Sequence, residues 1–274
     1  MTTLSETGEL AFVAELERRG LIVGVEHDAT VVGGLVVTQD ALVEGVHFLL
    51  DRLTWRELGF RAAAVNISDL AASGAVPEAL LVSLALPGAT AVDDALALYE
   101  GIAEAGVPVR GGDTTAAPVA CISVTALGRS ERVPGRAGAR PGDTLVVTAP
   151  LGGAGAAFRD GRYLRPPVRV DEGRELAQSA RALMDISDGL AVDAAHLARR
   201  SGVRCVVELD RVPLADGAGI DDLGFGEDFE LLAAVPEAGR FPVIGRVEEG
   251  DGVELLLHGE PYELAGWEHF ARGV

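Results

Sequence analysis

Residues 54–74 read TWRELGFRAAAVNISDLAASG, and this stretch predicts a long, tightly packed helix in the interior of the protein. Thr54 and Glu57 have the spacing of a capping box, which marks the start of a helix. Gly74 is the residue at which such a helix ends. The Ala-rich face between them indicates close packing against neighbouring elements, so the fold is organised around this segment.

Asp69 is an acidic residue within this apolar helix. A buried carboxylate without a partner is costly, so Asp69 needs a metal ion or a hydrogen-bond donor. It belongs to one of five short acidic motifs: VTQDALVEGVH (37–47), NISDLAASGA (66–75), GGDTT (111–115), DISDGLAVD (185–193) and GFGEDFEL (224–231). Carboxylates in contact repel by ~4 kcal/mol at an effective dielectric near 20, so a fold that gathers them normally gathers cations. An oxygen-preferring cation such as Mg²⁺ fits this chemistry.

The basic residues narrow the possible chemistry further. All 23 of them are Arg, and the chain has no Lys. This composition excludes a Walker A loop and a Schiff base. Any phosphate group would therefore be bound by metal ions, Arg side chains, backbone N–H groups or helix N-termini.

Length and composition predict a globular protein of about two domains. The chain has 274 residues, of which 48% are hydrophobic, and a formal net charge of −19. The negative charge argues against binding to nucleic acid or to an acidic membrane. Because no leader and no apolar run of about 20 residues is seen, we expect a cytoplasmic protein. Cys121 and Cys205 lie in apolar stretches, which favours buried free thiols over a disulfide or a metal pair.

Hydrophobic periodicity predicts a mixed α/β fold in two halves. An Arg-, Gly- and Pro-rich segment, 129–143, indicates a crossing between domains, with a boundary near Pro134 that separates 1–134 from 135–274. The motifs NISD and DISD leave internal duplication open. We expect helices at 8–19, 54–73, 91–105, 172–183 and 187–201, and strands at 34–38, 79–86, 107–110, 119–127, 144–148, 204–209, 229–235, 242–247 and 253–257.

The order of the motifs resembles that of a known enzyme family. The series VVTQDALVEGVHF, AVNISDLAASGAVP, GGDTT, RAGARPGD, RPPVR, MDISDGLAVD, GEDFEL and VIGRV is similar to the thiamine-monophosphate kinases, which belong to the aminoimidazole-ribonucleotide-synthetase-like ATP-binding superfamily. The resemblance runs nearly from end to end. It implies a two-domain fold in which an N-terminal domain of sheet and helices dimerises, a C-terminal mixed α/β domain follows, and the active cleft lies between the domains.

The reaction implied by the resemblance is transfer of the ATP γ-phosphoryl group to thiamine monophosphate. Donor and acceptor are both anions, so several Mg²⁺ ions would be needed to bring them together in line. A phosphate oxygen is already an ionised nucleophile at neutral pH. The resemblance therefore implies catalysis by positioning and metal ions, without a catalytic side chain, in a homodimer that binds ATP and thiamine monophosphate.

The resemblance also assigns roles to individual residues. It implies Mg²⁺ binding, directly or through water, by Asp28, Thr38, Asp40, Asp69, Asp113, Asp185 and Asp188. It implies ATP binding by Tyr99, Gly112, Asp113, Arg136 and Ser187, and substrate binding by His47, Glu227 and Trp267.

Several of these assignments have a structural alternative. Asp28 and Asp40 are also suited to a turn or a strand end, Asp113 and Glu227 to turns, and Tyr99 and Trp267 to ordinary packing. Ser187 is expected to cap the following helix as well as to contact ATP, and the two roles are compatible because a helix N-terminus attracts anions.

Two departures from the family pattern keep other functions open. Glu26-His27 stands where the family usually has Gly-Asp, and Gln39 replaces a hydroxyl residue before Asp40. The loops at 152–166 and 210–224 also look short. The alternatives are an ATP-dependent enzyme of the same superfamily with a different acceptor, and a non-catalytic relative that binds nucleotide or metal. The missing Lys and N-terminal Cys argue against selenophosphate synthesis.

Overall fold

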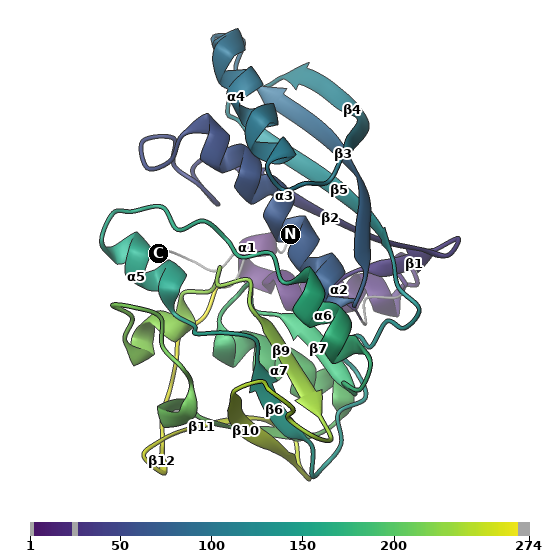
Figure 1. Ribbon diagram of the computed structural model, residues 1–274, viewed down its shortest axis with the longest axis vertical. Helices are drawn as coiled ribbons and strands as arrows, with labels where there is room; N and C mark the ends of the chain where they lie inside the picture. The colour runs from purple at the N-terminus through teal and green to yellow at the C-terminus, as the bar shows by residue number, and fades with distance from the viewer. Residues whose placement is uncertain (1–2, 24–26, 268–274) are drawn as a thin grey trace.

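The computed structural model describes residues 3–23 and 27–267, which form two sheets with helices packed against them (Figure 1). The first sheet has the strand order β1-β2-β5-β3-β4, and the second has the order β12-β11-β8-β10-β6-β9-β7. Each sheet is built from one half of the chain. The prediction of a mixed α/β fold is confirmed.

The first sheet is antiparallel except at one edge. Its strands are β1 (Thr30–Val32), β2 (Leu35–Val43), β3 (Val76–Leu86), β4 (Val109–Ala116) and β5 (Cys121–Arg129). β3 and β4 run parallel, with α4 (Val92–Ala103) between them in the chain. Buried side chains alternate along β5, so one face packs on the core while the other is partly exposed.

Helix α3 (Trp55–Ala72) lies at the centre of the molecule, as the sequence predicts. Thr54 and Glu57 form the expected capping box, and the helix ends before Gly74, whose φ is 63°. α3 packs against β2 and β5 of the first sheet and against β7 and α6 of the second half. A single helix therefore carries side chains to the junction of the two halves.

The second half surrounds a seven-stranded sheet. Its strands are β6 (Thr144–Val147), β7 (Ala182–Asp185), β8 (Arg204–Glu208), β9 (Leu231–Val235), β10 (Val243–Glu248), β11 (Gly252–Leu257) and β12 (Glu260–Pro261). Helix α7 (Leu190–Ser201) packs against one core and α6 (Val170–Ala177) against another. The remaining elements are α1 (Leu4–Thr7), α2 (Glu9–Arg18), α5 (Gly153–Arg159) and the 3₁₀ turns η1 (Leu209–Arg211) and η2 (Ile220–Gly224).

Several local predictions are wrong in detail. Asp40 lies inside β2 rather than at a strand end, and Asp113 lies inside β4, because β4 continues through its glycines while paired with β3. The helix predicted at 172–183 ends at Ala177, and residues 182–185 form a buried strand, since they pair with β9. Helix α5 was not expected. Its small residues pack closely on η2, a contact that local periodicity does not reveal.

Two further observations concern the thiols and the membrane. Cys205 is buried, as predicted, whereas Cys121 is only half-buried, and neither forms a disulfide. Among the described residues, no helix has both the length and the apolar character needed to cross a bilayer.

Candidate active site

A cavity of about 910 Å³ lies at the junction of the two halves. Its walls come from β2, α3, the segment after α5, and the turns before α7 and β9. The cavity gathers most of the residues that the sequence analysis selected: Asp28, Thr38, Asp40, His47, Asp69, Arg136, Asp185, Ser187, Asp188, Glu227 and Trp267. Residues far apart in the sequence thus meet around one space.

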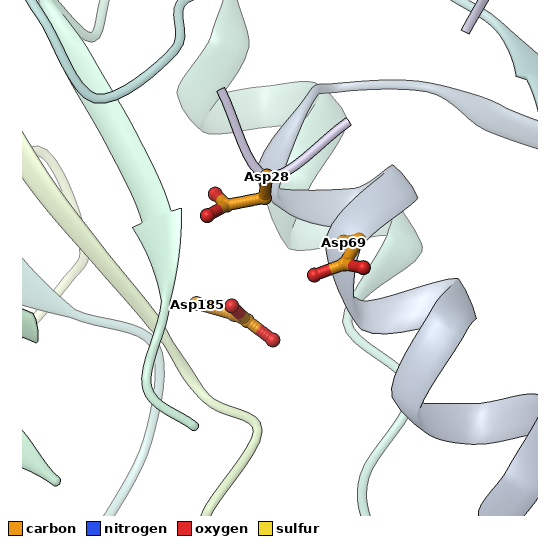
Figure 2. Close-up of side chains that lie close together, drawn as sticks. All are labelled: Asp28, Asp69 and Asp185. Carbon is orange, nitrogen blue, oxygen red and sulfur yellow. The ribbon is translucent and has the colours of Figure 1, made fainter. Parts of the chain in front are cut away.

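Three carboxylates that line this cavity form an acid cluster (Figure 2). Asp28 comes from the segment before β1, Asp69 from α3 and Asp185 from the end of β7. One carboxylate oxygen from each lies within 4.8 Å of the others. Oxygen ligands that converge from separate elements are the arrangement in which Mg²⁺ is held.

The acid cluster is electrostatically unfavourable without a cation. Burial, followed by the charge of Asp28, raises the pKa of Asp185 to about 8. Burial, followed by the charges of Asp40 and Asp185, raises the pKa of Asp69 well above its ordinary value. Asp28 Oδ2 is buried and has no hydrogen-bond partner among the described residues. A divalent cation would satisfy these oxygens, so the donor set fits Mg²⁺.

Neighbouring side chains hold the acidic groups in place. Arg136 Nε donates to Asp28 Oδ1 at 2.7 Å, and the Thr38 hydroxyl donates to Asp69. Ser68 Oγ donates to Asp185 Oδ2 at 2.6 Å. These bonds orient oxygens toward the cavity.

Asn66 makes a further bond from α3 to β2. Its Oδ1 accepts the backbone N–H of Asp40 at 3.0 Å, and its amide group donates to the Ala62 carbonyl. Asn66 and Ser68 were not predicted as site residues, although both stand within three positions of Asp69 in NISD. Asn66 lies three positions before Asp69 on α3 and shares its side of the helix, and Ser68 reaches the acid cluster through its bond to Asp185.

Helix α7, which follows the loop of residues 187–189, has a different N-cap from the one predicted. Gly189, not Ser187, is the N-cap and makes no side-chain cap hydrogen bond, whereas Asp193 in the first turn of the helix binds the loop that precedes it. Asp193 Oδ2 accepts the backbone N–H groups of Ser187, Asp188 and Gly189, each at 3.1 Å. The prediction that the Ser187 side chain caps α7 is wrong, because a buried carboxylate from the helix itself, that of Asp193, accepts these N–H groups.

The GEDF turn carries Glu227 into the cavity. Glu227 and Phe229 adopt positive φ values of 58° and 50°, which side-chain-bearing residues seldom do. At Gly226 a Cβ atom would lie 2.4 Å from the Ser187 carbonyl oxygen, so glycine allows the turn to approach the 187–189 loop. The Glu227 N–H donates to that carbonyl at 2.8 Å.

Glu227 is paired with Arg61, which the sequence analysis did not select. Arg61 lies on α3, is 7% exposed, and donates to the Glu227 carboxylate. Burial raises the pKa of Glu227, while Arg61 opposes that rise. A charged residue in the middle of an Ala-rich helical segment was the available sign of this pair.

The other predicted substrate residues also line the cavity. His47 Nδ1 accepts the Val43 N–H at 3.0 Å, and the Trp267 N–H donates to the Asp188 carbonyl at 2.9 Å. The Phe158 and Phe225 rings, 4.9 Å apart between centroids, add an aromatic wall that was not predicted. This wall is suited to a heteroaromatic ligand.

Three predicted nucleotide residues are not brought to this cavity by the described chain. Tyr99 packs against the hydrophobic core of the first half, which agrees with the alternative of ordinary packing. Gly112 and Asp113 lie on β4, an edge strand in which every residue is exposed. Gly112 is required there, because a Cβ atom would lie 1.7 Å from the Val82 carbonyl oxygen.

The departures from the family pattern have distinct locations. The Gln39 side chain accepts a hydrogen bond from Thr125 at 3.1 Å on the exposed side of β2, away from the Thr38 and Asp40 side. His27 packs against Gly135, and its Nδ1 atom has no hydrogen-bond partner among the described residues. Glu26 lies outside the described residues.

Comparison with known proteins agrees with this architecture. Residues 26–130 match the model of the AIR synthase related protein N-terminal domain, and residues 140–258 match that of the C-terminal domain. The boundary at Pro134 stays a prediction. The fold is similar to the solved structure of AaThiL complexed with AMPPCP and TMP, with a TM-score of 0.89 and 33% identity. The match covers 98% of this chain and 99% of that structure.

Curated relatives share sequence over most of their length. The thiamine-monophosphate kinase of Aquifex aeolicus is 36% identical in an alignment 272 positions long. That alignment covers 86% of this chain and 88% of the relative. That of Mycobacterium tuberculosis is 33% identical over 98% of this chain and 93% of the relative. With this similarity in sequence, domain composition and fold, the chain belongs to the thiamine-monophosphate kinase family.

Proposed function

We propose that this protein transfers the γ-phosphoryl group of ATP to thiamine monophosphate, producing thiamine diphosphate and ADP. The convergence of Asp28, Asp69 and Asp185 in a cavity between the two halves is the observation that carries this proposal. A phosphoryl transfer between two anions requires such a site for cations. The curated relatives support both the kinase activity and its place in thiamine biosynthesis.

The acid cluster would hold Mg²⁺, with Asp40, Asp188 and Thr38 beside it in the cavity wall. Bound Mg²⁺ would neutralise phosphate charge and align the reacting groups. The protein's own contribution is orientation. Thr38 and Ser68 fix the carboxylates of Asp69 and Asp185, and Arg136 fixes Asp28.

Both substrates would approach this centre within the cavity. Arg136 and Ser187 would contact the nucleotide, and Glu227, His47 and Trp267, which line the same cavity as Phe158 and Phe225, would contact the acceptor. A carboxylate such as Glu227 suits a cationic thiazolium or an aminopyrimidine, and Trp267 suits ring stacking. No general base is needed, because the acceptor phosphate is ionised at neutral pH.

We also propose that the working form is a homodimer in the cytoplasm. Strand β4 offers unpaired backbone groups at the edge of the first sheet, and all of its residues are exposed. An exposed edge of this length is a surface that another chain can cover. A second copy on this surface would bring Gly112 and Asp113 against another protein surface, which accounts for their position outside the cavity described above.

The test is formation of thiamine diphosphate from Mg·ATP, followed by chromatography, with and without thiamine monophosphate. We expect turnover that depends on both substrates and on Mg²⁺, and a loss of at least about 100-fold in Asp185→Asn. Asp143→Asn is the matched control, because Asp143 is buried and hydrogen-bonded but does not line the cavity. ATP binding without thiamine diphosphate would refute the proposal in favour of a different acceptor or a non-catalytic site.

A further inference from the structure

The 187–189 loop is bonded through its backbone on two sides. On one side, Asp193 Oδ2 accepts all three N–H groups at 3.1 Å. On the other side, the Ser187 carbonyl accepts the Glu227 N–H at 2.8 Å, and the Asp188 carbonyl accepts the Trp267 N–H at 2.9 Å. The loop therefore connects residues assigned to ATP, metal and substrate through main-chain hydrogen bonds.

Asp193 itself is hidden from the cavity. Its side chain belongs to α7, is 1% exposed, and does not line the cavity, whereas Ser187 and Asp188 do. Gly189, at φ 111°, allows the chain to turn so that three successive N–H groups reach one oxygen. A Cβ atom at Gly189 would also lie 2.9 Å from the Gly224 carbonyl oxygen, so this loop has little room to adopt another path.

We propose that Asp193 is a positioning residue that sets the geometry of both substrate sites by holding the 187–189 loop. The inference rests on the proposed function, which assigns Ser187 to ATP, Asp188 to metal, and Glu227 and Trp267 to the acceptor.

The same contacts affect how phosphate is recognised. Free N–H groups at the start of a helix ordinarily form an anion site. The N–H groups that bond Asp193 are those of Ser187, Asp188 and Gly189, which precede the first turn of α7, and they are not available to ATP in this arrangement. These residues would therefore contact ATP through a side chain, such as the Ser187 hydroxyl, rather than through their N–H groups.

The experiment measures binding without turnover, in the full-length protein. Mn²⁺ is titrated by electron paramagnetic resonance in the presence of AMPPCP, and AMPPCP binding is measured by calorimetry at saturating Mg²⁺. In Asp193→Asn we expect Mn²⁺ binding and AMPPCP binding each to weaken by at least about tenfold, because an amide oxygen is a weaker acceptor for three N–H groups. KM for thiamine monophosphate should rise as well, since Glu227 and Trp267 are bonded to the same loop.

Asp143→Asn serves as the matched control. Asp143 is a buried carboxylate that accepts the Arg140 N–H at 2.8 Å and pairs with Arg181 away from the cavity. We expect this variant to lose stability while keeping wild-type Mn²⁺ and AMPPCP affinities. A purely structural role for Asp193 would give the same pattern in Asp193→Asn, and that result would overturn the proposal.

A second variant covers the case in which Asp193→Asn does not fold. Asp193→Glu keeps the charge but moves the carboxylate by one methylene group, and the expected result is again weaker metal and nucleotide binding. Wild-type affinities in folded Asp193→Glu would contradict a positioning role. Because the readouts do not require phosphoryl transfer, failure of the kinase assay and failure of this inference are separate results.

Discussion

Asp69 belongs to the acid cluster, where it is half-buried beside Asp28, Asp40 and Asp185. Burial, followed by the charges of these neighbours, raises the pKa of Asp69. The folded protein therefore retains a proton that the unfolded chain releases above about pH 4. Stability of the metal-free protein consequently falls as the pH rises above that value.

Asp69→Asn should separate stability from function. The amide keeps an oxygen that can accept the Thr38 hydroxyl but removes the charge, so we expect the metal-free protein to gain about 1–3 kcal/mol at neutral pH. The gain should be small near pH 4 and grow as the pH rises. Turnover and stabilisation by Mg²⁺ should both be lost. Urea unfolding at several pH values, with and without Mg²⁺, measures each effect, and a less stable metal-free variant at pH 7 would contradict this account.

Helix α3 depends on glycine at its closest contact. A Cβ atom at Gly59 would lie 1.9 Å from the Leu98 carbonyl oxygen on α4, and one at Gly101 would lie 1.9 Å from the Arg56 carbonyl oxygen on α3. The two helices thus approach each other through reciprocal glycines. Since α3 also contacts the second half, its placement on α4 sets where Asp69 stands.

Gly59→Ala should force α3 and α4 apart. We expect a loss of about 2–3 kcal/mol in the free energy of unfolding, because the added methyl group meets backbone that cannot rotate away. Gly88→Ala is the control, since a Cβ atom there has nothing within 4 Å, and its effect should stay within about 0.5 kcal/mol. Equal urea midpoints for the two variants would show that the helices can move apart freely.

At the scale of the whole molecule, the outer face of the first sheet is incompletely covered. Leu81 on β3 is 40% exposed, and Val76 and Val109 on the same sheet are 43% and 36% exposed. They lie on the sheet that ends in the exposed strand β4. Apolar side chains beside an open strand edge favour association with another chain.

Leu81→Asp should therefore weaken the proposed homodimer. We expect at least a tenfold weaker self-association in sedimentation velocity, because a charge would be placed in an apolar interface. Turnover should fall with dimer content. Val92→Asp is the control, since Val92 is 75% exposed on α4 and lies outside this sheet. A wild-type protein that sediments as a fully active monomer would contradict the proposal.

Local sequence was sufficient to predict much of the fold. The capping box at Thr54, the course of α3 and its end before Gly74 could be predicted because each depends on residues within one or two helical turns. The strand at 182–185 and the passage of β4 through Asp113 could not, since both depend on pairing with strands far away in the sequence. Strand pairing overrides local propensity in such segments.

The candidate site also contains residues that the sequence could select and residues that only the folded structure revealed. Asp69 could be selected from the sequence because a carboxylate in an apolar helix requires a cation or a donor, and Asp28 and Asp185 could be selected from the resemblance to the family. The roles of Arg61 and Asp193 became visible only in the folded chain. Arg61 meets Glu227 across 166 positions, and the Asp193 carboxylate accepts the N–H groups of the 187–189 loop. Sequence specifies which groups are charged and which turns are possible, whereas packing between distant segments determines which charges face one another and which N–H groups remain free.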